Sequence, residues 1–174
     1  LSLVAKIKAA FINTKYEIPV IRTTFLVGFP GETEEDFEMT KKFLINLECL
    51  WSGVFTYSKE ENTLSFLMKN HIKERIKKKR MKILQEEQSK ITINLLKIFI
   101  GKVMLVLIEE VIENEDGIAI GRAWFQAPDV DGAVVVNFKN KDEIVNKNTI
   151  QEGSLVKVKI LKVLGFDLEG IVVS

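Results

Sequence analysis

The hydrophobic pattern of the chain changes its period at Gly101, and this change limits the folds that the chain can adopt. Before Gly101, helical stretches alternate with short runs of β-branched and apolar residues, an order typical of βα units and a parallel sheet. After Gly101, short strand-like runs are separated by turn residues such as Gly117 and Gly165. We therefore predict two units, an α/β unit over residues 1–97 and an all-β unit over residues 98–174.

The α/β unit is predicted to contain two strands and three helical stretches. Residues 20–28 are β-branched and almost continuously apolar, which predicts a strand buried on both faces. Thr33 is in position to cap the helix that follows, because Asp36 comes three residues later. The remaining predicted elements are a strand over 53–58 and helices over about 1–15 and 64–99.

The second unit is predicted to be a small barrel. Its five expected strands cover residues 102–112, 117–125, 132–138, 154–164 and 166–174. In the stretch "LVKVKILKV" apolar and basic residues alternate, which places one face inward and one outward. Five short antiparallel strands predict a closed barrel of the oligonucleotide/oligosaccharide-binding kind, because closure removes the exposed strand edges.

Composition excludes several classes of protein. Hydrophobic residues make up 47% of the chain and charged residues 28%, which indicates a soluble globular protein, and no run of about 18 apolar residues could span a membrane. The one cysteine, Cys49, excludes an internal disulfide and a cysteine-only metal site, and favours a reducing cytoplasm. His71, the one histidine, has no carboxylate or cysteine motif around it, so we assign no catalytic residue. Because the chain opens without Met and inside a helical pattern, we expect a fragment.

Charge separates the two units. Residues 1–97 carry 17 Lys and Arg against 12 Asp and Glu, a net charge of +5, whereas residues 98–174 carry 8 against 12, a net charge of −4. Such an asymmetry indicates that the two units have different partners.

The stretch "FLVGFPGET", residues 25–33, ends a predicted strand in a turn with two glycines and a proline. Ligands of α/β proteins bind at the carboxyl ends of parallel strands. Gly28 and Gly31 allow the backbone to approach a ligand without a Cβ, and Pro30 stiffens the turn. A tight connection between a strand and a helix needs the same residues, so from these residues alone both interpretations stay open.

Four segments follow one another along the chain: "RTTFLVGFPGETEEDF" (22–37), "GVFTYSKEENT" (53–63), "KKKRMKILQEEQSKI" (77–91) and "GRAWFQAPDVDG" (121–132). In this order they resemble the carboxyl-terminal half of the radical S-adenosylmethionine methylthiotransferases. The resemblance implies the last part of a partial, TIM-like α/β barrel, followed by a five-stranded barrel called a TRAM domain. Asn62 stands where the family usually has glycine, and Asn tolerates a positive φ better than most residues.

The resemblance also implies S-adenosylmethionine and two 4Fe-4S clusters as cofactors of the full-length enzyme. It implies cofactor contacts for Val27, Gly28, Phe29, Pro30 and Gly31, with Phe29 facing the adenine. Such clusters need cysteine thiolates in triads, and Cys49 matches no such motif. We therefore expect this chain to hold no cluster with its own cysteine and to be inactive by itself.

The segment "GRAWFQAPDVDG" is most similar to the branch of the family that methylthiolates an aspartate of the small-subunit ribosomal protein S-twelve. An acidic barrel suits a basic ribosomal protein and repels phosphate. The residues that we expect to recognise the substrate protein are Glu109, Glu110, Glu113, Arg122, Trp124, Asp129 and Asp131.

Alternatives to these assignments stay open. A tRNA-modifying member would bind tRNA with its barrel, and Lys157, Lys159 and Lys162 favour that alternative. The alternative for the acidic cluster of Glu109, Glu110, Glu113, Glu115 and Asp116 is that it forms the solvated end of a hairpin and binds no partner. Residues 69–90, with nine basic and three acidic side chains, form either the solvated face of a long helix or a contact with ribosomal RNA.

Overall fold

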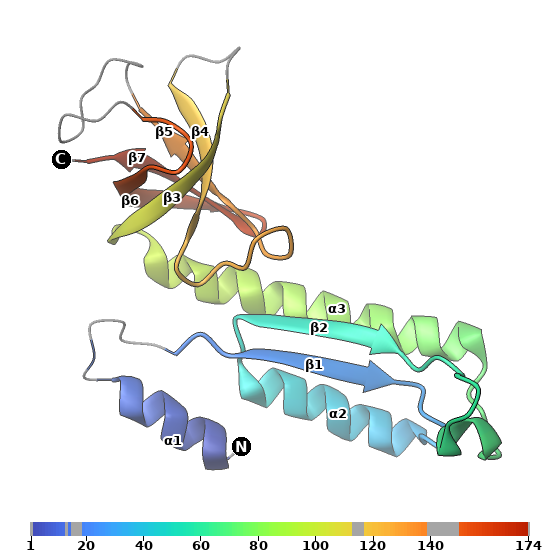
Figure 1. Ribbon diagram of the computed structural model, residues 1–174. Helices are drawn as coiled ribbons and strands as arrows, with labels where there is room; N and C mark the ends of the chain where they lie inside the picture. Colours follow the sequence, from blue (N-terminus) through green and yellow to red (C-terminus); the bar gives the residue numbers. More distant parts are fainter. Residues whose placement is uncertain (1, 13, 15–18, 113–116, 139–149, 174) are drawn as a thin grey trace. The chain divides into compact units, whose positions relative to one another are not determined.

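A computed structural model of the chain describes residues 2–12, 14, 19–112, 117–138 and 150–173 (Figure 1). The chain divides into two compact units, Leu1–Thr92 and Ile93–Ser174. The first combines helices with a parallel strand pair, and the second is a closed β-barrel, as the sequence predicts. In the part of the chain that the structure describes, no helix is long and apolar enough to cross a membrane.

The first unit is built around a strand–helix–strand segment. β1 (Arg22–Val27) and β2 (Trp51–Thr56) are parallel neighbours, and α2 (Glu34–Leu47) connects them (Figure 1). A short helix, α1 (Ser2–Phe11), precedes β1. Parallel strands need such a crossover connection, so the alternation read from the sequence is confirmed here.

The helix α2 begins where the sequence predicts. The Thr33 hydroxyl accepts a hydrogen bond from the Asp36 amide at 3.1 Å, and the Asp36 carboxylate accepts one from the Thr33 amide at 2.9 Å. These two bonds form a capping box. The bond from the Thr33 backbone, and then that from its hydroxyl, lower the pKa of the Asp36 carboxyl below its ordinary value.

The core of the first unit lies on one face of the strand pair. Phe25 and Val27 of β1 are buried there with Leu44 of α2. The alternate residues of the strands point away from this core: Leu26 is 51% exposed, and its register partner Phe55 is 59% exposed. The expectation that residues 20–28 are buried on both faces is therefore wrong, because helices cover one face of this two-stranded sheet in the described residues.

The helical stretch predicted over 64–99 is interrupted. A 3-10 turn, η1 (Leu64–Leu67), is followed by non-helical residues before α3 (Glu74–Leu96) and a second 3-10 turn, η2 (Lys97–Phe99). Asn70 has a φ of 65°, which an α-helix cannot contain. Asn62 likewise has a φ of 63°, so asparagine takes the left-handed conformation at the position where the family usually has glycine.

Two polar side chains of α3 are buried in the first unit. Gln88 donates a hydrogen bond to the carbonyl of Cys49 at 2.9 Å, and Thr92 donates one to the carbonyl of Leu50 at 2.7 Å. Both carbonyls belong to the turn between α2 and β2, where the strand and helix ladders leave them without partners. These bonds fix α3 to that turn.

The second unit contains the five predicted strands. They are β3 (Val103–Val111), β4 (Ile118–Ala123), β5 (Val134–Asn137), β6 (Leu155–Leu164) and β7 (Asp167–Val172). They close into a barrel in the order β3-β4-β5-β7-β6. Its interior is aliphatic, and Val106, Val136 and Ile160 have no more than 1% of their surface exposed.

One strand pair of the barrel departs from the prediction. All neighbours are antiparallel except β5 and β7, which are parallel. The reason is geometric: strand directions cannot alternate all the way around a ring with an odd number of members. A closed barrel of five strands must therefore contain at least one parallel pair.

Candidate functional site

The chain turns sharply where β1 ends. Gly28 has a φ of 80°, and the Glu32 amide donates a hydrogen bond to the Phe29 carbonyl at 3.0 Å. Residues 29–32 thus form a type II turn, in which Pro30 and Gly31 occupy the two central positions and Gly31 has a φ of 88°. Proline favours the first of these positions and glycine the second, so the requirements of a tight turn account for this sequence.

The amides of both glycines in this turn already have partners within the chain. The Gly28 amide donates to the Glu32 carboxylate at 2.7 Å, and the Gly31 amide donates to the Asn70 carbonyl at 3.0 Å. The Tyr57 amide binds the Val27 carbonyl at 2.8 Å. A ligand at this turn would therefore meet side chains and the remaining carbonyl groups rather than these two glycine amides.

Lys77 fills the space beside Gly28. A Cβ placed on Gly28 would lie 2.2 Å from Cγ of Lys77, which is far inside van der Waals contact. The ammonium group of Lys77 donates to the Tyr57 carbonyl at 2.7 Å and lies 2.9 Å from the Glu74 carboxylate. Since the end of the side chain is held, it cannot move aside easily, and Gly28 is needed for packing as well as for its φ.

Arg80 of α3 holds the turn to that helix through several contacts. Its side chain is only 6% exposed, and its guanidinium lies 2.6 Å from the Glu32 carboxylate and 3.0 Å from that of Glu34. It also donates to the Glu32 carbonyl at 3.2 Å and lies over the ring of Phe37. Glu32 thus connects Gly28 to Arg80, because its two carboxylate oxygens bind one each.

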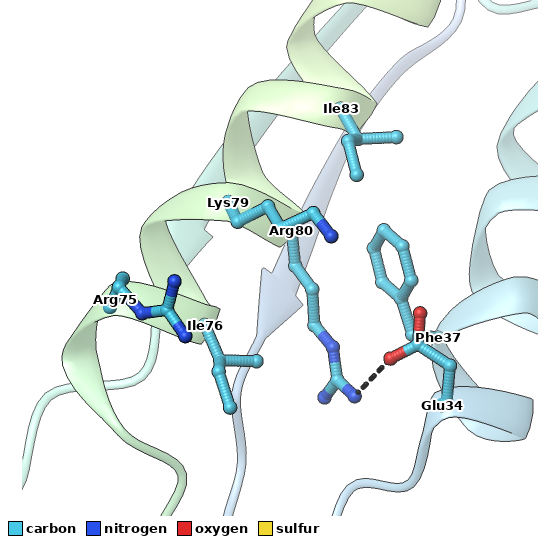
Figure 2. Close-up of a pocket in the computed structure, with 7 residues that line it drawn as sticks. All are labelled: Glu34, Phe37, Arg75, Ile76, Lys79, Arg80 and Ile83. Carbon is cyan, nitrogen blue, oxygen red and sulfur yellow. Dashed lines mark hydrogen bonds and ion pairs between the residues drawn. The ribbon is translucent and has the colours of Figure 1, made fainter.

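Figure 2 shows Arg80 reaching from α3, between Ile76 and Phe37, toward Glu34. A cavity of about 550 Å³ lies here, and its lining residues are Glu34, Phe37, Arg75, Ile76, Lys79, Arg80 and Ile83. None of the five predicted cofactor residues lines this cavity, and Arg80 is the residue that it shares with the contacts of the turn. Nε of Arg80 is buried and has no hydrogen-bond partner in the described part of the chain.

An aromatic series extends from the turn. Phe29 is 42% exposed, and its ring meets that of Tyr57 edge-on at a centroid distance of 5.3 Å. The Tyr57 ring in turn stacks on His71 at 6.1 Å. The Tyr57 hydroxyl is buried and lacks a hydrogen-bond partner among the described residues. Buried hydroxyls without partners are uncommon, and a water or a ligand is the usual explanation.

Sequence reasoning missed Glu32, Tyr57, Lys77 and Arg80. All four lie inside the segments that carry the family resemblance, which was the available signal. Charge patterning alone could not separate Lys77 and Arg80 from the basic residues around them.

Cys49 is a buried thiol. It is 2% exposed and lies in the core cluster of the first unit. Burial raises the pKa of this thiol, which keeps it protonated at neutral pH. Over the described residues, no group of three or more His, Cys, Asp or Glu side chains could hold a metal ion.

The described recognition residues of the barrel lie in two places, on the strands β3 and β4 and in the segment that follows β4. Glu109 and Glu110 lie near the end of β3, and Glu109 forms an ion pair with Arg122 of β4. Trp124, Asp129 and Asp131 lie in the segment between β4 and β5. Glu113 falls outside the described residues.

Among the predicted recognition residues between β4 and β5, Trp124 presents the largest apolar surface. It is 48% exposed, whereas its neighbour Phe125 is 4% exposed and stacks on Phe99 at a centroid distance of 4.2 Å. Asp131 accepts a hydrogen bond from the Ala127 amide, which orders the segment. Phe125 is therefore part of the core, and Trp124 alone of the two aromatic residues is placed to contact a partner.

Positive charge lies on strand β6 of the barrel. Lys157 and Lys159 point outward from β6, and their register partners Leu105 and Val103 on β3 are 56% and 53% exposed. Lys162 lies beyond a register shift and pairs with Glu169 at 3.0 Å. Two of the three lysines that favoured the RNA alternative thus share one exposed face.

Known proteins match the barrel alone in one comparison and nearly the whole chain in another. A family model of the TRAM domain matches residues 100–173. The chain is 50% identical to the ribosomal protein uS12 methylthiotransferase RimO of Treponema denticola, over 99% of the chain and 38% of that protein. It is 40% identical to the RimO proteins of Petrotoga mobilis and Aquifex aeolicus, over 94% and 91% of the chain. The chain thus spans between 35% and 38% of the length of these relatives.

Proposed function

We propose that this chain, which belongs to the radical S-adenosylmethionine methylthiotransferase family, is the carboxyl-terminal part of an enzyme that methylthiolates an aspartate of ribosomal protein uS12. The observation that carries the proposal is the continuity of the match, since a 50% identity extends through both the α/β unit and the barrel. The substrate implies that the enzyme works in the cytoplasm, where ribosomes are assembled.

We propose that residues 1–97 complete the cofactor barrel of that enzyme and that residues 98–174 form its TRAM domain. The exposed apolar face of the strand pair supports the first part. Leu26 and Phe55 are register partners and are both more than half exposed. Apolar neighbours on a central strand pair are normally covered, and further strands and the interior of a larger barrel would cover them.

S-adenosylmethionine is proposed to bind at the turn after β1, through Val27, Gly28, Phe29, Pro30 and Gly31. The half-exposed ring of Phe29 offers an apolar surface for the adenine, and the nearby Tyr57 hydroxyl offers a hydrogen bond that no described residue uses. The roles of this chain are to bind and orient the cofactor, whose cleavage by a cluster supplies the radical chemistry of the family. Arg80, Glu32 and Lys77 would keep the turn in shape.

The two 4Fe-4S clusters do not fit the residues of this chain. Clusters of this kind need several thiolates, and the one thiol here is buried with a raised pKa. We propose that the cluster ligands belong to the remainder of the enzyme and that the isolated chain is inactive.

The barrel is proposed to recruit the substrate protein through Glu109, Glu110, Glu113, Arg122, Trp124, Asp129 and Asp131. Its net charge of −4 favours a basic protein partner. A tRNA substrate is the second candidate, because Lys157 and Lys159 share an exposed face of β6.

Product analysis with the full-length enzyme separates the two candidates. The reconstituted enzyme is incubated with small ribosomal subunits and, separately, with unmodified tRNA, and both are analysed by mass spectrometry. We expect a methylthiolated aspartate in uS12 and unmodified tRNA. Methylthiolated nucleoside together with unmodified uS12 would contradict the proposal. For the isolated chain, stoichiometric iron after anaerobic reconstitution would contradict the assignment of the clusters to the remainder of the enzyme.

A further inference from the structure

The first nine residues of α3 contain a row of four cations that the proposed function does not use. Arg75, Lys78, Lys79 and Lys82 are all exposed. Their spacing of three, four and seven residues from Arg75 places them on one face of the helix. We call these four residues the basic stripe.

The basic stripe is distinct from the buried cations of the same helix. Lys77 and Arg80 point inward: the Glu74 carboxylate and the Tyr57 carbonyl hold Lys77, and two carboxylates hold Arg80. In the stripe, Lys82 lies 3.9 Å from Glu86, and the other three cations have no ion pair with any described residue. The structure thus divides the cations of residues 75–82 into two that point inward, Lys77 and Arg80, and the four of the basic stripe, which point outward.

The chemistry of this outer face limits its partner. The large hydrophobic residues that are exposed in this chain include none between residues 69 and 97. A helix that lies in a membrane surface needs an apolar face, and a stable protein interface needs an apolar core. Four exposed cations, three of them without an ion pair among the described residues and with no exposed large hydrophobic residue on the same helix, provide neither, but they do fit a chain of phosphates.

Spacing supports the same partner. With a rise of about 1.5 Å per residue, Arg75 and Lys82 lie about 10 Å apart along the helix axis. A nucleic acid strand places one phosphate about every 3.4 Å along its axis, so the stripe matches about three successive phosphates. We propose that the basic stripe of α3 binds the sugar–phosphate backbone of a structured RNA.

This inference goes beyond the proposed function, because it concerns a second contact and not the group that is modified. A protein substrate that belongs to a ribosomal subunit is surrounded by RNA, so a backbone contact would hold the enzyme beside it. Direct binding of RNA tests the inference separately from product analysis. Methylthiolation of uS12 without RNA binding would overturn the inference alone, and RNA binding without methylthiolation would overturn the proposed function alone.

The test measures the affinity of the 174-residue chain for a fluorescently labelled RNA duplex between about 50 and 200 mM salt. The logarithm of affinity falls with that of salt concentration by somewhat less than one for each phosphate contact. We expect a slope of about −3 for the unchanged chain. The double variant Lys78→Gln and Lys79→Gln should lower the affinity at least tenfold at the lowest salt and reduce the slope by about 2.

A matched control carries the same change in net charge elsewhere. Lys6 on α1 and Lys42 on α2 are exposed, and neither has an ion pair with a described residue. The variant Lys6→Gln and Lys42→Gln should retain the affinity and the slope. An equal loss in both double variants would overturn the proposal, since it would show a response to net charge alone.

Two further outcomes would overturn it. If Lys157→Gln and Lys159→Gln abolish RNA binding while the stripe variant does not, the RNA contact belongs to the barrel. If poly-glutamate binds the stripe more tightly than RNA does, the partner is an acidic protein. Circular dichroism melts check that each variant stays folded, which we expect because all the replaced side chains are exposed.

Discussion

The same chemical pair, an arginine with a glutamate, occurs in both units of this protein in opposite surroundings. In the first unit, the side chains of Arg80 and Glu32 are 6% and 13% exposed. In the barrel, those of Arg122 and Glu109 are 34% and 39% exposed. The buried pair is tied to the backbone of a turn, whereas the exposed pair joins two strands that their own ladder already holds.

The difference shows that the presence of an ion pair does not by itself indicate its importance. Breaking a buried pair leaves a charge that water cannot reach, whereas breaking an exposed pair returns both groups to solvent. We therefore expect the turn to respond to substitution through stability and the barrel surface to respond through association and salt.

The largest expected effect follows from replacing Arg80 by Met. The Glu32 carboxylate would lose its cation while remaining mostly buried, which costs about 3–5 kcal/mol of unfolding free energy. The measurement is urea unfolding followed by Trp51 fluorescence in a Trp124→Phe background, because each unit contains one of the two tryptophans. The control is Arg75→Met at an exposed position, which should change stability by less than about 0.5 kcal/mol. Equal effects at the two positions would remove the contrast between buried and exposed charges.

A second comparison uses the two glycines of the turn. Both have a positive φ, so replacement by Ala strains either backbone by about 1–2 kcal/mol. At Gly28 the new Cβ also meets Lys77, which adds about 1–3 kcal/mol, whereas at Gly31 nothing lies within 4 Å.

Unfolding measurements on Gly28→Ala and Gly31→Ala should therefore differ, and Lys77→Ala should reduce the difference. If the two variants are equally stable, Lys77 does not fill the space beside Gly28. In the full-length enzyme, Gly31→Ala separates cofactor binding from packing, because its Cβ meets no described atom.

A smaller effect concerns the cap of α2. Thr33→Ala removes the hydroxyl that accepts the Asp36 amide and should cost about 1 kcal/mol. Because the folded pKa of Asp36 is lowered, its stabilising contribution is present above its ordinary value and is lost as pH falls through the lowered value. Titration of the Asp36 carboxyl by NMR should show its pKa move upward in the variant, and an unchanged pKa would contradict the role of the hydroxyl. Thr40→Ala, at a half-buried position within α2, is the matched control, because the Thr40 hydroxyl binds the carbonyl of Asp36 and not its carboxyl.

The smallest effect on stability is expected at the barrel surface. Glu109→Gln should change unfolding by less than about 1 kcal/mol, because the pair with Arg122 is exposed. Reversal of Glu109, Glu110 and Glu113 to Lys should instead slow association with uS12 at low salt. Charge screening over about 10 Å at 0.1 M should reduce that difference. Association rates measured at two salt concentrations check this, and an unchanged rate at low salt would leave Trp124 and its segment as the recognition surface.

Local signals in the sequence predicted most of the fold. The capping pair Thr33 and Asp36 and the turn residues Gly28 to Gly31 act through neighbours in the chain, so their conformations can be read from a few letters. The five barrel strands are marked by alternation and by glycines for the same reason. The single parallel pair could also have been predicted, because it follows from closing an odd number of strands.

Long-range partners could not be predicted in this way. Arg80 binds Glu32 across more than 40 residues, and nothing in the run "KKKR" distinguishes the inward cations from the outward ones until the rotation of α3 is known. Asn70, which lies before that helix, likewise has a distant partner, because its carbonyl accepts a hydrogen bond from the Gly31 amide. The pairing of Arg122 with Glu109 likewise required the register of β3 and β4, which includes a shift after Ile108.

The chain separation of the strands that are paired in the ring also sets an order for the assembly of the barrel. The pairs β3–β4 and β6–β7 are hairpins between consecutive strands and close short loops, whereas β5 with β7 and β3 with β6 join segments far apart in the chain. Closing a long loop costs more entropy before any contact repays it. We therefore expect the β5–β7 and β3–β6 pairs to form after the hairpins and to limit the folding rate. The strand β5 pairs with β4 on one side and with the parallel strand β7 on the other. Its amides should therefore exchange with solvent only when the whole barrel opens.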